Sequence, residues 1–92
     1  MSTVTLRYWA AAKQAAGVAE ETISAGTLAA ALEAALSARE RNAAAGADSD
    51  LRAVLARSSF LVDGTPVGRR APETVTLREA AVVEVLPPFA GG

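Results

Sequence analysis

Apolar and polar residues alternate from residue 3 to residue 9, and this period of two predicts a β-strand with one face toward a core. The apolar positions of the strand are Val4, Leu6 and Tyr8. Residues 10–16 are rich in alanine and predict a short helix, with Gly17 as the residue that closes it. Residues 21–24 predict a second, weaker strand, so the chain opens with a strand, a wide connection and another strand.

The middle of the chain changes to a helical period. Leucines at spacings of four, Leu28, Leu32 and Leu36, predict an amphipathic helix that ends near residues 39–42. Thr27 precedes the first leucine and is a good N-cap residue. We expect residues 43–50 to form a loop and residues 51–57 to form a short helical turn.

The last third of the chain predicts short strands. We expect them over residues 60–62, 65–67 and 81–86, with a further strand or turn over residues 73–77. Asp63 and Gly64 form a pair typical of a two-residue hairpin turn. Pro87 and Pro88 cannot continue the ladder of a central strand, so the sheet is predicted to end before them.

This order of elements predicts an α+β fold in which a mixed sheet packs on one long helix. The first and last strands are the most apolar, so we expect them side by side in the centre of the sheet. That arrangement is the ubiquitin-like β-grasp. We therefore expect one domain over residues 1–92, with a flexible C-terminal tail at residues 87–92.

Composition narrows the chemistry that the chain can perform alone. It has 92 residues, a net charge of −1 and neither Cys nor His, which removes thiolate nucleophiles, the commonest general base and most metal ligands. We therefore expect no bound metal. No basic field is present for nucleic acid or an anionic membrane, and no apolar run reaches the roughly 18 residues of a membrane span. A cytoplasmic location is the expectation.

The sequence ends in two glycines, Gly91 and Gly92. Because glycine has no side chain, such an end can enter a narrow channel in another protein and present its carboxylate there. Pro87 and Pro88 stiffen the base of this tail. The alternative is an incidental tail on a noncatalytic interaction module.

The segment from Leu86 to Gly92, Leu-Pro-Pro-Phe-Ala-Gly-Gly, resembles the C-terminal signature of the small-subunit family of molybdopterin synthase, which are ubiquitin-like sulfur carriers. The opening strand, Gly17, the long helix and the Asp63-Gly64 turn extend the resemblance over most of the domain. The chain departs from the family at residues 79–81, Glu-Ala-Ala, where members usually carry an Asp-Gly-Asp turn. Residues 43–50 also resemble a surface insertion.

The resemblance implies that a partner enzyme related to ubiquitin-activating enzymes uses ATP to adenylate the carboxyl group of Gly92. A persulfide then converts it to a thiocarboxylate, with no cofactor held stably by this chain. The large subunit of molybdopterin synthase receives the tail and transfers the sulfur to cyclic pyranopterin monophosphate. The chain is then a subunit of a sulfurtransferase and a cosubstrate, not a catalyst alone. A carrier for thiamine or cysteine synthesis, or a modifier of lysines, is the alternative.

Partner binding also needs a surface. Trp9 and Leu86 are predicted to form an apolar patch on the sheet face away from the helix, with Pro66 and Val67 nearby. The tail itself contributes the other predicted partner contacts, which are Pro87, Pro88, Phe89 and Ala90. Lys13, the only lysine, is expected on a solvated helix face.

Overall fold

Five strands form one mixed sheet in the order β2-β1-β5-β3-β4 within the computed structural model, which describes residues 2–42 and 47–88. The strands are β1 (Ser2–Tyr8), β2 (Glu20–Ala25), β3 (Ser59–Val62), β4 (Thr65–Pro66) and β5 (Val82–Leu86). The helices are α1 (Ala10–Ala16), α2 (Leu28–Asn42) and α3 (Ala47–Arg57), with a 3-10 turn at Pro72–Thr74. This α+β arrangement is the predicted ubiquitin-like β-grasp.

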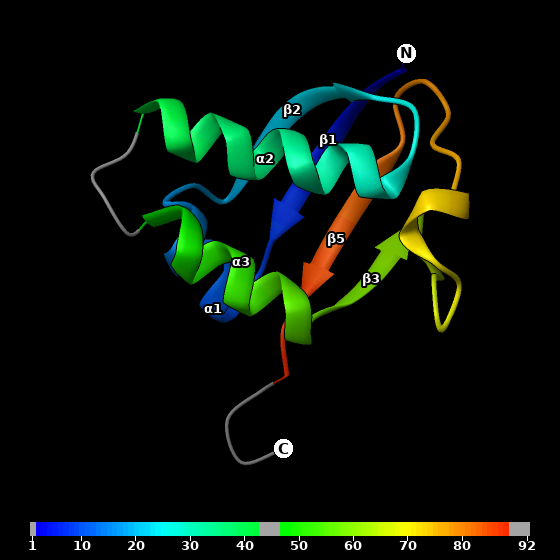
Figure 1. The fold of residues 1–92 in the computed structure, drawn as a ribbon. Helices are drawn as coiled ribbons and strands as arrows, with labels where there is room; N and C mark the ends of the chain where they lie inside the picture. The colour runs from blue at the N-terminus through cyan, green and yellow to red at the C-terminus, as the bar shows by residue number, and fades with distance from the viewer. Residues whose placement is uncertain (1, 43–46, 89–92) are drawn as a thin grey trace.

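The first and last strands are adjacent and parallel in the centre of the sheet, as the sequence predicted. Their register runs from Thr5 opposite Val82 to Tyr8 opposite Val85. β2 pairs antiparallel with the outer side of β1, and β3 pairs antiparallel with β5. Because β1 and β5 run in the same direction, their carboxyl ends lie at one edge of the sheet (Figure 1).

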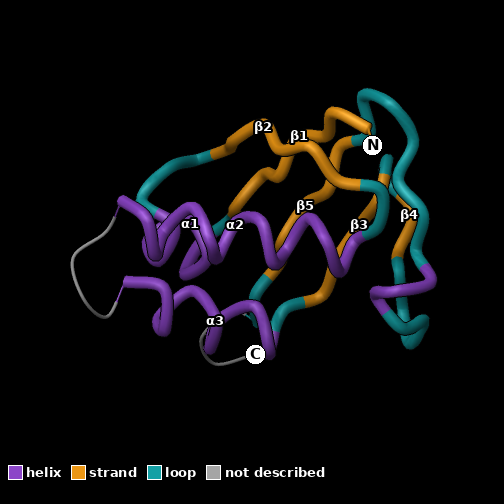
Figure 2. The backbone as a smooth tube through the Cα atoms, turned by 45° about the horizontal axis from the view of Figure 1, so that its top comes forward, coloured by secondary structure: helices purple, strands orange, loops and turns teal. Residues whose placement is uncertain are grey.

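The helices lie on one face of this sheet, and the core fills the space between them (Figures 1 and 2). The apolar side of β1 is buried there, as are Leu28 of α2 and Leu51 of α3. Tyr8 is only 2% exposed, and its hydroxyl donates a hydrogen bond to the carboxylate of Glu21. The buried apolar area, not any polar contact, is the main stabilising contribution.

α2 is the long helix that the sequence predicted, and α3 is a helix of 11 residues where only a short helical turn over residues 51–57 was expected. It begins at Ala47, inside the segment expected to be a loop, while residues 43–46 of that segment lie outside the described residues. The apolar residues after residue 50 have helical spacing, and Leu51, Val54 and Leu55 are all buried on one side of α3. Tertiary burial of that side stabilises a helix that propensity alone leaves marginal.

The predicted turns are confirmed where the backbone requires unusual φ values. Asp63 and Gly64 have φ of 51° and 83°, the signs that a type I′ hairpin turn needs between β3 and β4. Gly17 has φ of 82° and closes α1, and its N–H donates to the carbonyl of Lys13 at 2.9 Å. Residues 79–81 still form a turn before β5, with Ala80 at φ of 67°.

The entry to α2 is fixed by Thr27. Its Oγ1 accepts a hydrogen bond from the N–H of Ala30 at 3.2 Å, which is the N-cap contact that the sequence predicted. Thr27 also forms an isolated antiparallel bridge with Thr76. The predicted strand or turn over residues 73–77 is therefore the end of the 3-10 turn followed by this single bridge.

Candidate docking site at the end of strand β5

The chain leaves the sheet at the carboxyl end of β5. Leu86 is the last paired residue and lies opposite Ser59 of β3. Pro87 is buried and Pro88 is exposed, so the described chain passes from the body of the domain to its surface at this step. The predicted site residues Phe89, Ala90, Gly91 and Gly92 lie outside the described residues.

Trp9 lies beside this exit because β1 and β5 are parallel neighbours. Its backbone N–H donates to the carbonyl of Val85 at 3.3 Å, and its own carbonyl accepts from the N–H of Ala12 at 3.0 Å. These contacts fix Trp9 between the end of β1 and the start of α1. Trp9 is 42% exposed.

Charged side chains hold the indole ring of Trp9. Its Nε1 donates to Oε1 of Glu84 at 3.2 Å, and the guanidinium carbon of Arg7 lies 5.6 Å from the ring centroid. Arg7 also forms an ion pair with Glu20 at 3.8 Å. A cation over an exposed ring contributes about 0.5–1 kcal/mol, enough to bias the ring orientation. The indole is thereby presented in a preferred orientation.

The sheet register shows which residues share the face that Trp9 occupies. Arg7 lies opposite Glu84, Glu84 opposite Leu61, and Leu61 opposite Pro66, so all four side chains point to one face. Leu86 belongs to the same face by alternation along β5. We call this helix-free side the open face, and define it by Trp9, Leu61, Pro66, Glu84 and Leu86.

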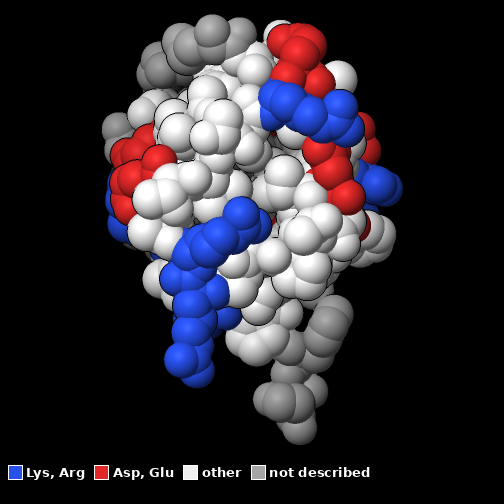
Figure 3. Space-filling model, turned by 90° about the vertical axis from the view of Figure 1, so that its right-hand side faces the viewer, with Lys and Arg blue, Asp and Glu red and all other residues white. Residues whose placement is uncertain are grey.

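Leu61 and Glu84 were not predicted as site residues. Strand alternation alone would have placed Glu84 on the same side as Leu86, but only the register of β3 against β5 brings Leu61 to that side. Figure 3 views the molecule from the right of Figure 1 and shows uncharged, basic and acidic side chains next to one another on that side.

The placement of Val67 on this surface was wrong. Val67 is 5% exposed and belongs to the core, and its N–H donates to the carbonyl of Phe60 at 3.0 Å. The physical reason is alternation: Pro66 points to the open face, so the next residue points inward. Val67 therefore supports Pro66 from below and does not offer a surface to a partner.

Asp63 is the charged residue whose environment the structure defines most clearly, and it lies at the opposite end of β5. The N–H of Val82, which donates to Oδ1 at 3.0 Å, lowers the pKa of Asp63 from its ordinary value. Desolvation opposes this shift in part, and Arg78, whose Nε lies 3.1 Å from Oδ2, adds to the lowering. Asp63 is thus a structural residue of the turn region.

Within residues 2–42 and 47–88, no cluster of three or more His, Cys, Asp or Glu side chains is placed to hold a metal ion. None of the helices in this part of the chain has the length and apolar character needed to cross a membrane.

The fold and this surface define a class of protein: a ubiquitin-like β-grasp domain whose last described residues, Pro87 and Pro88, lie beside the open face. The family model named ThiS family matches residues 6–92, which is almost the whole chain. The chain belongs to the ThiS family, in which ubiquitin-like domains act as sulfur carriers. Comparison with curated protein sequences found no match.

Solved structures agree on the fold. Small archaeal modifier protein 1 from Methanosarcina acetivorans is similar with a TM-score of 0.74 at 20% identity, covering 100% of this chain and 98% of that one. A putative molybdopterin converting factor subunit 1 from Pyrococcus furiosus has a TM-score of 0.70 at 22% identity, covering 97% and 100%. The complex of subunits 1 and 2 of molybdopterin-converting factor from Helicobacter pylori has a TM-score of 0.64 at 21% identity, covering 98% and 99%.

Proposed function

We propose that this chain is the small subunit of a molybdopterin synthase, a cytoplasmic sulfur carrier that bears the sulfur as a thiocarboxylate on Gly92. The observation that carries the proposal is the parallel pairing of β1 with β5, which sets Trp9 and Leu86 at the foot of a segment that ends in Gly-Gly. The family match extends through Gly92, so the terminal glycines belong to the shared pattern.

The chemistry follows from the carboxylate itself. A carboxylate is a poor acyl donor because oxide is a poor leaving group, so a partner enzyme uses ATP to form an acyl adenylate on Gly92 and releases pyrophosphate. The terminal sulfur of a persulfide on the partner attacks the acyl carbon and AMP leaves, which gives an acyl disulfide. A second thiol of the partner then attacks the partner's sulfur of that S–S bond, so that the thiocarboxylate is released and a disulfide remains on the partner. The carrier supplies the acyl group, and its open face supplies binding energy.

Two observations favour the molybdenum pathway among the possible sulfur pathways. Pro87 and Pro88 precede the tail, and the solved structures similar to this chain include subunit 1 of molybdopterin-converting factor from two organisms. One of these structures is a complex with subunit 2. By this analogy the large subunit is the partner that takes up the loaded tail.

Intact-mass spectrometry of the chain purified from its native cell tests the carrier chemistry. Replacement of one oxygen by sulfur adds about 16 Da to the mass. A variant lacking Gly92 is expected to fold normally and to gain no sulfur. A wild-type chain that never shows the added mass, or a shortened chain that still supports cofactor synthesis, would contradict the proposal.

The pathway is tested by reconstitution. The thiocarboxylated chain, the large subunit and cyclic pyranopterin monophosphate are mixed, and dithiolene formation is measured. No product from this mixture, with sulfur released instead in a thiamine or cysteine assay, would assign the chain to the alternative pathway.

A protein modifier is the second candidate, favoured by the similarity to small archaeal modifier protein 1. A modifier forms isopeptide bonds between its terminal glycine and lysines of other proteins. Trypsin would leave residues 79–92 attached to a modified lysine, because Arg78 is the last basic residue of the chain. A search for this remnant on lysines in tryptic digests of cell extracts separates this function from the carrier. An inert interaction module would show neither the thiocarboxylate nor such remnants.

A further inference from the structure

A second surface lies next to the open face, around helix α1. Among the described residues, the large apolar side chains that stay exposed are Trp9 at 42% and Val18 at 41%, and both line the same hollow. The hollow lies on the α1 side of Trp9, whereas the open face lies on the β5 side. Single exposed apolar side chains are common on protein surfaces, but two of them in one depression indicate a binding surface.

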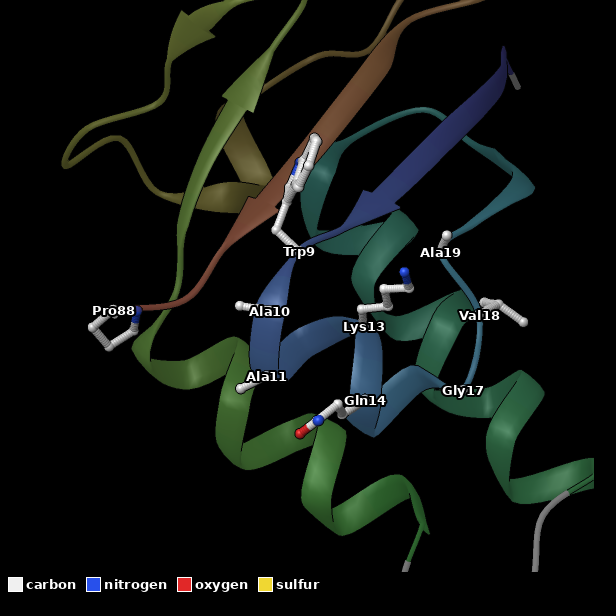
Figure 4. A pocket seen from close by; sticks show the side chains of 9 residues that line it. All are labelled: Trp9, Ala10, Ala11, Lys13, Gln14, Gly17, Val18, Ala19 and Pro88. Atoms are coloured by element: carbon white, nitrogen blue, oxygen red, sulfur yellow. The ribbon is translucent and has the colours of Figure 1, made fainter. Parts of the chain in front are cut away.

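Small residues between Trp9 and Val18 give the hollow its shape. Ala10, Ala11 and Ala19 give it a shallow floor, and Gly17, whose φ is 82°, turns the chain so that Val18 forms the far rim. Figure 4 shows Pro88 at one end of the hollow and Val18 at the other, with the start of α1 between them. The surface therefore begins where the described chain ends.

One charge marks this surface. Lys13 is the residue with a charged side chain in the lining, it is exposed, and it is the only lysine of the whole chain. Gln14 adds a neutral polar group. A depression with apolar ends and a single ammonium group is complementary to an apolar side chain that has a carboxylate close to it.

We propose that the hollow around α1 is a second docking surface, which accepts an apolar side chain flanked by a carboxylate on the enzyme that adenylates the tail. This inference rests on the proposed function. Trp9 belongs to both surfaces, so an enzyme that contacts the open face also reaches the hollow. Contacts on both sides of Pro88 fix the direction in which the chain leaves the domain.

The adenylation step explains why such a contact is needed. The enzyme brings the carboxylate of Gly92 to ATP, and these two anions repel each other. Binding energy from parts of the carrier remote from the reacting atoms offsets that repulsion. Lys13 attracts an acidic surface on the enzyme without approaching the nucleotide, and Val18 supplies apolar area at the same place.

The test uses the full-length chain, the adenylating enzyme of the same cell and ATP–pyrophosphate exchange. Val18→Asp is expected to raise KM for the carrier about tenfold with kcat nearly unchanged, because it removes binding but not chemistry. The matched control is Ala30→Asp, which adds the same carboxylate at an exposed position in the first turn of α2. Circular dichroism confirms that both variants fold.

The charge is tested by Lys13→Gln. Its KM is expected to rise severalfold at low salt, and the difference from wild type should shrink at high salt. Arg52→Gln is the control, since it removes one positive charge from α3, outside the hollow. If KM changes equally in Lys13→Gln and Arg52→Gln, the effect comes from the net charge of the chain and not from the position of Lys13. That result would overturn the proposal that Lys13 contacts the enzyme.

The remaining outcomes distinguish a failure of the proposed function from a failure of the inference about the hollow. If wild-type chain supports no exchange with any adenylating enzyme, the proposed function fails and this inference fails with it. If wild type is active and Val18→Asp matches it, the inference alone fails. Weaker binding only to the large subunit, or a dimer of this chain that Val18→Asp dissociates in sedimentation, would assign the hollow to another occupant and overturn the inference.

Discussion

Ala80 adopts a backbone conformation that residues with a Cβ usually avoid, and the fold still tolerates it. Its φ of 67° lies in the left-handed region, where a Cβ is disfavoured by about 1–2 kcal/mol. The turn forms because neighbouring hydrogen bonds hold it, with the N–H of Ala80 donating to the carbonyl of Thr3 at 2.8 Å. The family members resembled by this sequence carry glycine there, which removes that strain.

Ala80→Gly is therefore expected to stabilise the domain by about 0.5–1 kcal/mol, the relief of strain being partly offset by the entropy of glycine. Urea unfolding measures the change. Ala56→Gly is the control, because Ala56 is exposed in α3 and the same substitution there should destabilise by about 1 kcal/mol. A loss of stability in both variants would contradict the strain at residue 80.

Asp63 is the second residue whose environment predicts a measurable effect. Its pKa is lowered first by the N–H of Val82 and then by Arg78, so the folded protein favours the carboxylate. A lowered pKa contributes stability above the ordinary value of 3.8, and this stability is lost as the pH falls through the folded value.

Asp63→Asn tests this contribution, because asparagine tolerates the φ of 51° and still accepts from Val82. Wild type is expected to be more stable than the variant at pH 7, and the difference should shrink as the pH falls below about 3.8. Urea midpoints of both proteins at pH 7 and pH 3 measure it. A difference that stays constant with pH would contradict the role of the carboxylate.

At the scale of the elements, caps and burial decide where the helices begin and end. Thr27 starts α2 through a side-chain contact that the sequence identifies by itself. The start of α3 is different, because residues 48–50 are polar residue types typical of a loop yet belong to the helix. The buried side of α3, with Leu51 fully inaccessible, stabilises the whole helix against α1 and α2.

Thr27→Ala is expected to cost about 1 kcal/mol of unfolding free energy, because the N–H of Ala30 loses its acceptor. Thermal or urea unfolding measures the loss. Thr27→Ser keeps the hydroxyl and should retain most of the stability. Equal losses in the alanine and serine variants would show that the methyl group, not the cap, is responsible.

At the scale of the whole molecule, the parallel pair of β1 and β5 joins the two ends of the sequence. Trp9 and Glu84 are 75 residues apart in the chain, and their side chains are in hydrogen-bond contact at 3.2 Å. The same pairing places the chain exit between the open face and the hollow around α1. One topological feature thus positions both surfaces that the proposals use.

Trp9→Ala is expected to weaken binding to the large subunit at least tenfold, because an exposed indole in an oriented position is a typical interface hot spot. The fold should survive, since the ring is 42% exposed and outside the core. Calorimetry measures binding and circular dichroism measures the fold. Trp9→Phe keeps an aromatic ring and should lose less; an unfolded Trp9→Ala variant would reject the surface placement.

The sequence by itself determined the strands, the α2 cap, the hairpin turn and the adjacency of the first and last strands. The strands, the cap and the turn follow from the period of apolar residues and from backbone sterics, both of which act over a few neighbouring residues. The adjacency was inferred because the first and last strands are the most apolar and therefore belong in the centre of the sheet. The departure from the resembled pattern at residues 79–81 was visible in the sequence, but whether a turn forms there was left open. The terminal glycines were likewise identified as candidate chemistry without any structure.

Tertiary structure alone decided the rest. The burial of Val67, the arrival of Leu61 on the open face and the extension of α3 depend on which strands and helices pack together. So does the hollow that brings Val18 near Trp9 and Pro88. The physical reason is range: hydrogen-bond register and side-chain burial join residues distant in the chain, and no local pattern encodes which partner each will meet.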